Sequence, residues 1–138
     1  DSLRARRRED EWTAFMVAAS HGHLDVARLL LERDPGCLAD RSKERLTPLM
    51  AAASSGHSQL VEWLVQQEAQ GASSSIDAVN CEGMTALAHA ARDGREQAAL
   101  VLLQYGASAN VKDLQGRTPA QHALSDFPEL AQALQVSE

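Results

Sequence analysis

The sequence predicts an all-α protein, a solenoid of about four stacked helical hairpins. First, a threonine that can cap a helix recurs at intervals of 34, 38 and 33 residues. These threonines are Thr13, Thr47, Thr85 and Thr118. Second, a glycine that lets the chain reverse lies nine residues after each of the first three, at Gly22, Gly56 and Gly94. Third, 44% of the residues are hydrophobic but only 4% are aromatic, so alanine and branched aliphatic side chains must fill closely packed helix interfaces.

The stretch from residue 80 to 107 shows one repeating unit most completely. The Thr85 hydroxyl can cap the free N–H groups of a helix rich in small residues, and Gly94 then allows the chain to reverse. A second helix presents an apolar face before Gly106 ends it as a left-handed C-cap. That face carries Ala98, Val101 and Leu102, with Ala99 and Leu103 beside them. One hairpin of this kind cannot enclose its own apolar face, so it needs copies stacked alongside.

Each hairpin opens with a phrase of the same form. The phrases are Thr13-Ala-Phe-Met-Val-Ala-Ala19, Thr47-Pro-Leu-Met-Ala-Ala-Ala53, Thr85-Ala-Leu-Ala-His-Ala-Ala91 and Thr118-Pro-Ala-Gln-His-Ala-Leu124. They resemble the ankyrin repeat, whose period is about 33 residues. The resemblance implies an ankyrin-repeat solenoid in which the turns project as β-turn fingers. It also implies that the first helices form the floor of a concave groove, the usual partner-binding surface of that family.

The predicted repeats divide the chain into five segments. Residues 1–11 are strongly charged and are either a polar N-terminal cap or the end of a preceding repeat. Residues 12–40 are repeat 1, 41–79 are repeat 2 with a loop insertion near 68–75, 80–112 are repeat 3, and 113–138 are repeat 4, a C-terminal cap. Because the chain starts at Asp1 rather than at methionine, we expect it to be a fragment of a longer protein.

The second helix of repeat 1 is expected over residues 24–33, with four apolar side chains directed inward. These are Val26, Ala27, Leu29 and Leu30. Trp63 occupies the place of Leu29 in repeat 2, so we expect it to pack between second helices.

The last helix is expected over residues 128–136, and its start has its own signal. Asp126 as N-cap with Glu129 three residues later resembles a capping box. The helix is polar on one side, which suits a terminal cap.

Composition and charge exclude several classes of function. The net charge of −6 argues against nucleic-acid binding, which needs a basic face. No apolar run reaches the roughly 20 residues of a membrane span, and no signal peptide is visible, so we expect no membrane association and a cytoplasmic or nuclear location. Cys37 and Cys81 are expected to be free thiols. The basic run at residues 4–8 is either a targeting arm or a solvated helix end paired with the acidic residues that follow.

No residue set indicates catalysis, a cofactor or a metal. No serine lies in a strand-turn-helix elbow, and no Gly-rich phosphate loop is present. His21 and His23 have the wrong spacing for two ligands on one helix face, and Gly-His recurs at Gly56 in the next reversal. His89 and His122 recur at equivalent places, as a structural role predicts. We therefore expect a protein that is not an enzyme, with no cofactor and no metal site.

Two rows of residues are candidates for binding a partner. The residue before each threonine is expected near a fingertip, exposed to solvent, and three of the four are apolar; packing against neighbouring segments is the alternative. This row is Trp12, Leu46, Met84 and Arg117. The row next to the reversal glycines is polar: Ser20 and His21, Ser54 and Ser55, Arg92 and Asp93, Ser125 and Asp126. Cys81 and Leu114, in two of the predicted turns, complete the set.

These residues predict a non-catalytic protein–protein interaction module. Apolar anchors with a polar rim suit an extended peptide of another protein lying across repeats 1 to 3. We expect a monomer that serves as part of a larger scaffold, adaptor or regulatory protein. The alternative is a small inhibitory ankyrin protein acting on a kinase or another enzyme.

Overall fold

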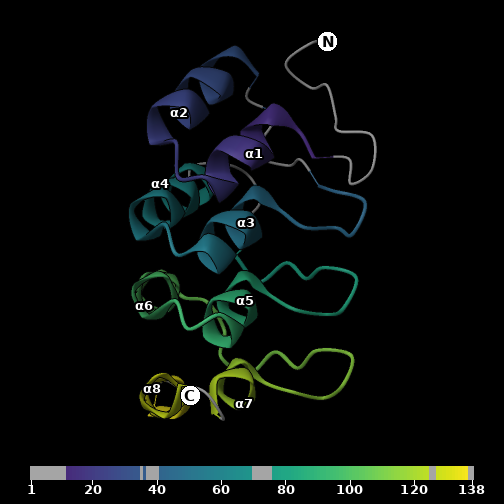
Figure 1. Cartoon of the computed structure of the whole chain (residues 1–138), viewed down its shortest axis with the longest axis vertical. Helices are drawn as coiled ribbons and strands as arrows, with labels where there is room; N and C mark the ends of the chain where they lie inside the picture. Colours follow the sequence, from purple (N-terminus) through teal and green to yellow (C-terminus); the bar gives the residue numbers. More distant parts are fainter. Residues whose placement is uncertain (1–11, 35, 37–40, 70–75, 125–126, 137–138) are drawn as a thin grey trace.

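The computed structural model describes residues 12–34, 36, 41–69, 76–124 and 127–136. Within these residues the chain forms eight helices arranged in two columns (Figure 1). The helices are α1 (Ala14–Ser20), α2 (Leu24–Arg33), α3 (Pro48–Ser55), α4 (Ser58–Ala69), α5 (Ala86–Arg92), α6 (Glu96–Gln104), α7 (Pro119–Leu124) and α8 (Pro128–Val136). The prediction of an all-α solenoid of four hairpins is confirmed.

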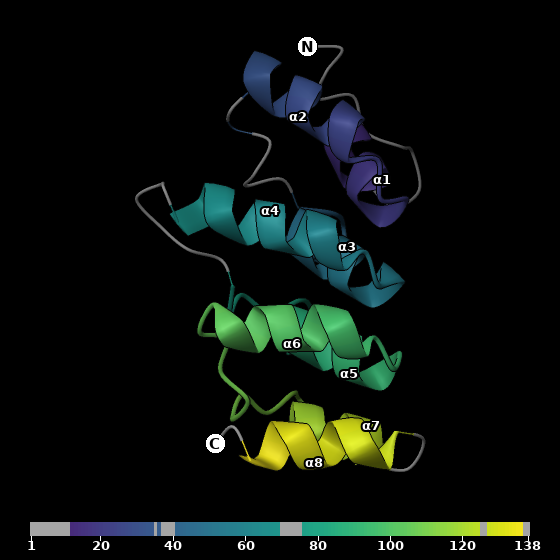
Figure 2. The ribbon, with the colours of Figure 1, turned by 90° about the vertical axis from the view of Figure 1, so that its left-hand side faces the viewer.

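The first helices of the hairpins, α1, α3, α5 and α7, form one column, and the second helices form the other. The turns that precede α3, α5 and α7 project sideways from the first column, away from the second helices, as a row of fingers (Figure 1). In Figure 2 the second helices face the viewer and each hairpin forms a separate layer. The molecule is therefore a one-dimensional stack in which each hairpin packs on its neighbours.

The threonines cap the first helices as predicted. The hydroxyls of Thr13, Thr47 and Thr85 accept hydrogen bonds from the backbone N–H groups three residues later, at 3.3, 3.2 and 3.1 Å. Thr118 does the same at 3.3 Å. Each bond satisfies a donor that the first helical turn would otherwise leave without a partner.

The reversal glycines have two structural roles. Gly22, Gly56 and Gly94 have φ of +73°, +80° and +70°, a region that side chains disfavour. Each glycine also packs directly against a side chain of the next repeat. A Cβ atom would lie 2.6 Å from His57 at Gly22, 2.9 Å from Arg95 at Gly56, and 2.4 Å from Phe127 at Gly94. Glycine is therefore needed for the backbone turn and for close approach between repeats.

Two of these overlying side chains also hold the end of the previous first helix. His57 donates from Nε2 to the carbonyl of Ser20 at 3.1 Å, and Arg95 donates from Nε to the carbonyl of Ser54 at 3.0 Å. The two carbonyls belong to the last turns of α1 and α3. Carbonyl groups in a last turn have no N–H partner within their own helix. Consecutive repeats are thus joined by hydrogen bonds as well as by packing.

The core runs the length of the stack and consists mainly of alanine and leucine. Its largest fully buried side chains include Phe15, Leu49, Leu87 and Leu102. The expected inward direction of Val26 and Leu29 is wrong, because these side chains are 46% and 56% exposed. Ala27 is buried and Leu30 is half-buried, so the face of α2 that packs on the core is narrower than predicted.

Trp63 packs against a first helix rather than only between second helices. Its side chain is half-buried, and its ring lies 6.4 Å from that of Phe15 in α1, at a tilt of 54°. A tilted aromatic pair at this distance is favourable. The ring therefore bridges repeats 1 and 2 across the two columns.

Some predictions fall outside the described residues. They concern the charged segment 1–11 with its basic run, Cys37, most of the insertion near 68–75, and Ser125 with the capping-box residue Asp126.

Replacing Leu87 by alanine tests the core. Leu87 is fully buried in α5, so Leu87→Ala should lower the free energy of unfolding by about 2–5 kcal/mol through the cavity that it leaves. Leu114→Ala, at a side chain that is 79% exposed, should change it by less than about 0.5 kcal/mol. Urea unfolding followed by circular dichroism measures both; equal costs would contradict the assigned core.

Candidate functional site: a pocket between the fingers and the first helices

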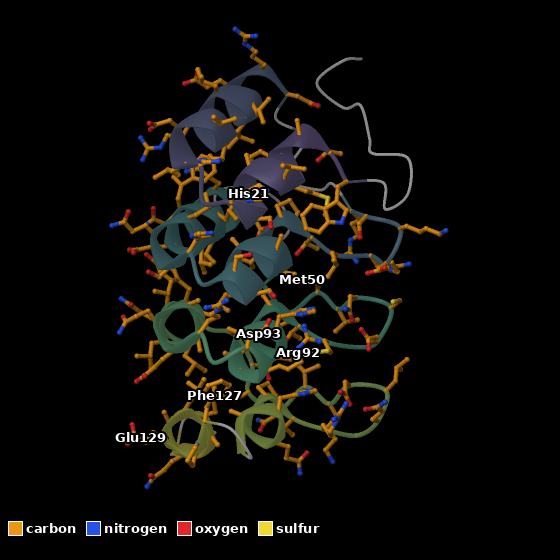
Figure 3. The ribbon with its side chains drawn as sticks, viewed as in Figure 1. His21, Met50, Arg92, Asp93, Phe127 and Glu129 are labelled. Carbon is orange, nitrogen blue, oxygen red and sulfur yellow. The ribbon has the colours of Figure 1, made fainter. Side chains whose placement is uncertain are left out.

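A pocket of about 210 Å³ lies where the fingers meet the first helices of repeats 1 to 3. It is lined by Trp12, Ser20, Glu44, Leu46, Met50, Ala51, Ser54, Ser55, Asn80, Glu82, His89 and Arg92. Figure 3 labels Met50 and Arg92 on this side of the first-helix column. Side chains from three successive repeats therefore converge on one concave site.

The pocket brings together part of the predicted binding set. Of the residues predicted to bind a partner, six line the pocket: Trp12, Ser20, Leu46, Ser54, Ser55 and Arg92. Five further lining residues were not predicted to bind a partner, and His89 was assigned only a structural role; the five are Glu44, Met50, Ala51, Asn80 and Glu82. Three of these residues could have been recognised from the sequence. Glu44 and Glu82 fall in the predicted turns, and Met50 follows Thr47 by three residues.

The expectation that Met84 is exposed is wrong. Its side chain is only 3% exposed, and Leu46 and Trp12 are half-buried. The backbone explains this result: the Met84 N–H donates to Asn80 Oδ1 at 3.0 Å and its carbonyl accepts from the Asn80 N–H at 3.0 Å. These bonds place the residue before the threonine at the base of the finger, next to the core. For Met84 the packing alternative is therefore correct.

Neighbouring fingers are joined by backbone hydrogen bonds near their tips. The Cys81 N–H donates to the carbonyl of Glu44 at 3.0 Å, and the Leu114 N–H donates to the carbonyl of Glu82 at 3.0 Å. Cys81 is an exposed free thiol and Leu114 is 79% exposed, so both lie on the outer surface of the finger row. The row forms one wall of the pocket, through Glu44 and Glu82.

In each of the fingers before α3, α5 and α7, one polar side chain accepts hydrogen bonds from backbone N–H groups of the same finger. Ser42 Oγ accepts from the backbone N–H groups of Glu44 and Leu46, at 3.2 and 3.1 Å. Asn80 Oδ1 bonds Glu82 in the same way at 2.9 Å, and Asp113 Oδ1 bonds two N–H groups of the fourth finger, both at 2.9 Å. All three residues lie five positions before the capping threonine. Short polar side chains of this kind stabilise turns by bonding their own backbone.

In repeats 3 and 4 a histidine ties the finger to the first helix. Asn80 Nδ2 lies 3.2 Å from His89 Nε2, and His122 Nε2 lies 2.9 Å from Asp113 Oδ2. Each histidine is four residues after the threonine, so the polar residue and the histidine recur as a pair. The predicted structural role of both histidines agrees with this geometry.

His89 forms part of the pocket and is held neutral. Its side chain is 5% exposed, and burial followed by the charge of Arg92 lowers the pKa of His89 to about 4. Asn80 Oδ1 accepts two backbone N–H groups, so the Asn80 amide turns its donor nitrogen toward the ring. The Arg92 guanidinium lies 3.4 Å from Nδ1, so an imidazolium ring would face two donors.

For Asp113, hydrogen bonds to the charged carboxylate outweigh the effect of burial on the pKa. Burial alone would raise its pKa, but the backbone N–H groups of Arg117 and Gln115, together with His122, hold the pKa of Asp113 below its usual range. The fourth finger is thus stabilised by an ionised carboxylate, whereas the third uses a neutral amide.

The polar rim of the pocket links repeats 2 and 3. Ser54 Oγ donates to Asp93 Oδ2 at 2.6 Å, and Asp93 Oδ1 lies 3.5 Å from Arg92 Nε. The Arg92 guanidinium also contacts the Met84 sulfur at 3.7 Å. Asp93 therefore holds Arg92 at the edge of the pocket, although Asp93 does not line it.

The remaining predicted residues lie away from the pocket. His21 is exposed at the end of α1, and its ring lies 6.0 Å from that of His23. Arg117 belongs to the fourth finger, where its Nε lies 3.6 Å from Asp113 Oδ2. Their roles in binding stay predictions.

Across residues 12–34, 36, 41–69, 76–124 and 127–136, no three His, Cys, Asp or Glu side chains gather as metal ligands would. In the same part of the chain, no helix has the length and apolar character that crossing a bilayer requires.

A stack of capped helical hairpins with linked fingers and a concave pocket defines a repeat solenoid. The family model described as ankyrin repeats (3 copies) matches residues 2–74 and 70–137, and the chain belongs to the ankyrin-repeat family. Ankyrin repeats are generally protein–protein interaction modules and are typically non-catalytic. No curated protein matches this chain.

Stability should fall on acidification because of His89. The pKa of His89 is about 6.5 in the unfolded chain and about 4 in the fold, so the unfolded state takes up the proton first as the pH falls. The free energy of unfolding should therefore be unaffected by the protonation of His89 above about pH 6.5. Between about pH 6.5 and pH 4 it should fall by on the order of 3 kcal/mol. Urea unfolding across this range measures it.

His89→Gln should flatten this part of the pH profile, since glutamine has no proton to gain. His21→Gln, at an exposed ring, is the matched control and should leave the profile as in the wild type. A profile that His89→Gln leaves unchanged would contradict the role of the buried ring.

Proposed function

We propose that this protein is a non-catalytic interaction module that binds an extended segment of another protein in the pocket between the fingers and the first helices. The single observation that carries the proposal is the convergence of three repeats on one cavity of about 210 Å³. A site that spans several repeats can read several side chains of one extended segment. Family membership supports the same role, because ankyrin repeats generally bind proteins.

The lining of the pocket indicates which ligand chemistry fits. Trp12 and Leu46, which are both half-buried, supply an apolar part, and tryptophan is among the residue types enriched in binding hot spots. Ser55 and Arg92 offer polar contacts at the rim. The pocket therefore suits a peptide with an apolar anchor and polar flanking groups.

The charge of the site argues against nucleic acid as the ligand. Glu44 and Glu82 form the finger wall, and the whole chain carries a net charge of −6. Phosphate groups would be repelled by this wall, because nucleic-acid binding depends on basic neutralisation. We propose a monomeric module within a cytoplasmic or nuclear scaffold, adaptor or regulatory protein.

Arg92→Glu should weaken peptide binding by at least about 10-fold, because it reverses the charge at the rim and arginine is a frequent hot spot. Phage-displayed random peptides selected on the wild-type protein provide the ligand, and fluorescence anisotropy of the selected peptide measures affinity. Ser55→Arg should give a similar loss by filling the pocket.

Arg33→Glu is the matched control, since it makes the same charge change at an exposed residue of α2, outside the pocket. It should leave affinity unchanged, and circular dichroism should show that all three variants are folded at the temperature of the binding assay. Peptides that bind all variants equally would contradict the proposed site. Met84→Asp is unsuitable for this test, because Met84 is buried and its replacement would unfold the repeat.

A further inference from the structure

The outer face of repeat 1 exposes apolar side chains at positions that are buried or half-buried in the later repeats. Val26 and Leu29 in α2 are 46% and 56% exposed, and Ala14 at the start of α1 is also exposed. Exposed apolar side chains grouped on one face of a stack need an explanation, because an end repeat is expected to present a polar outer face.

The positions equivalent to these three are covered in every other repeat. Val26 lies three residues after His23, which immediately precedes the second helix, and the same place after His57, Arg95 and Phe127 holds Leu60, Ala98 and Leu130, which are 2%, 1% and 4% exposed. Ala14 corresponds to Pro48, Ala86 and Pro119, all buried. Leu29 corresponds to Trp63, Val101 and Ala133, all half-buried. Repeat 1 alone leaves this set of positions open.

Repeat 4 shows which side of the hairpin these positions face. Its first helix α7 packs on α5, and among the described residues repeat 3 is its only neighbouring repeat. Pro119 and Leu130 are nevertheless buried there, so their positions face the preceding repeat. The position two residues further along each first helix shows the reverse pattern of burial. Met16, Met50 and Ala88 are buried, whereas Gln121 in repeat 4 is exposed, so that position faces the following repeat.

We propose that Ala14, Val26 and Leu29 form an internal stacking surface that takes a further ankyrin-type helical hairpin on the N-terminal side of repeat 1. The incoming hairpin would present a small or aliphatic side chain where this chain has Met16, Met50 and Ala88. In repeats 2 to 4 these positions lie against the hairpin that comes before, and the same packing can continue on the N-terminal side of repeat 1. This surface is separate from the pocket and from any ligand of the pocket.

A tethered hairpin fits this surface better than a second copy of the chain does. Three apolar side chains, two of them only about half-exposed, offer little apolar surface to hold a second copy that is not tethered. A hairpin on the same polypeptide needs less apolar surface, because its effective concentration is high.

The test adds a repeat and asks whether it stacks on this face. A copy of residues 80–112, spliced in ahead of Arg8, reproduces the 33-residue interval between Thr85 and Thr118. The five-repeat chain should unfold in a single transition with a higher melting temperature than the original chain. Val26→Asp with Leu29→Asp should lower that temperature by roughly 5–10 °C in the five-repeat chain, and by less than about 2 °C in the original.

Leu100→Asp is the matched control, because Leu100 is 40% exposed on α6 and should cost the same in both chains. Equal costs of the Val26 and Leu29 changes in the two chains, or separate melting of the added repeat, would overturn the proposal. A large loss in the original chain would show that the chain already covers this face itself. A dimer in sedimentation velocity that the two substitutions dissociate would make a second copy the occupant, which also overturns it.

Discussion

The structure depends on close approach between hairpins that are too small to fold alone. Each pairs a first helix of six to eight residues with a second of nine to twelve, so its apolar face must be covered by a neighbour. The approach is close because glycine lies at each of the first three reversals and alanine lines the first helices. His57 and Arg95 then bond the end of the previous helix, so the contact that buries the core also sets the orientation of successive repeats.

The geometry of the pocket follows from this arrangement. Its floor is a row of first helices whose spacing is set by the core, and its wall is a row of fingers joined to one another at Cys81 and Leu114. The pair Asn80 and His89 connects wall to floor within repeat 3. A ligand would therefore meet a surface that is already formed, which lowers the entropy cost of binding.

Much of this could be predicted because the responsible interactions are local. Thr85 caps a backbone group three residues away, and Gly94 adopts the positive φ that its position requires, so a single sequence shows both. Met84 was placed wrongly because its burial depends on how Asn80 folds the finger back toward the helix. Val26 and Leu29 have the correct helical period for a buried face, but whether a face is covered depends on the neighbouring repeat. The pocket combines three repeats, and no spacing within one repeat indicates its shape.

The unequal repeat intervals have an evolutionary consequence. Thr47 and Thr85 are 38 residues apart and Thr85 and Thr118 are 33 apart, yet the bond from Cys81 to Glu44 and the bond from Leu114 to Glu82 have the same length of 3.0 Å. Side-to-side contacts, rather than the length of the connecting chain, therefore determine how the layers align. The connection after α4 can gain or lose residues while the pocket keeps its shape, so new loops can be acquired there without disturbing the stack.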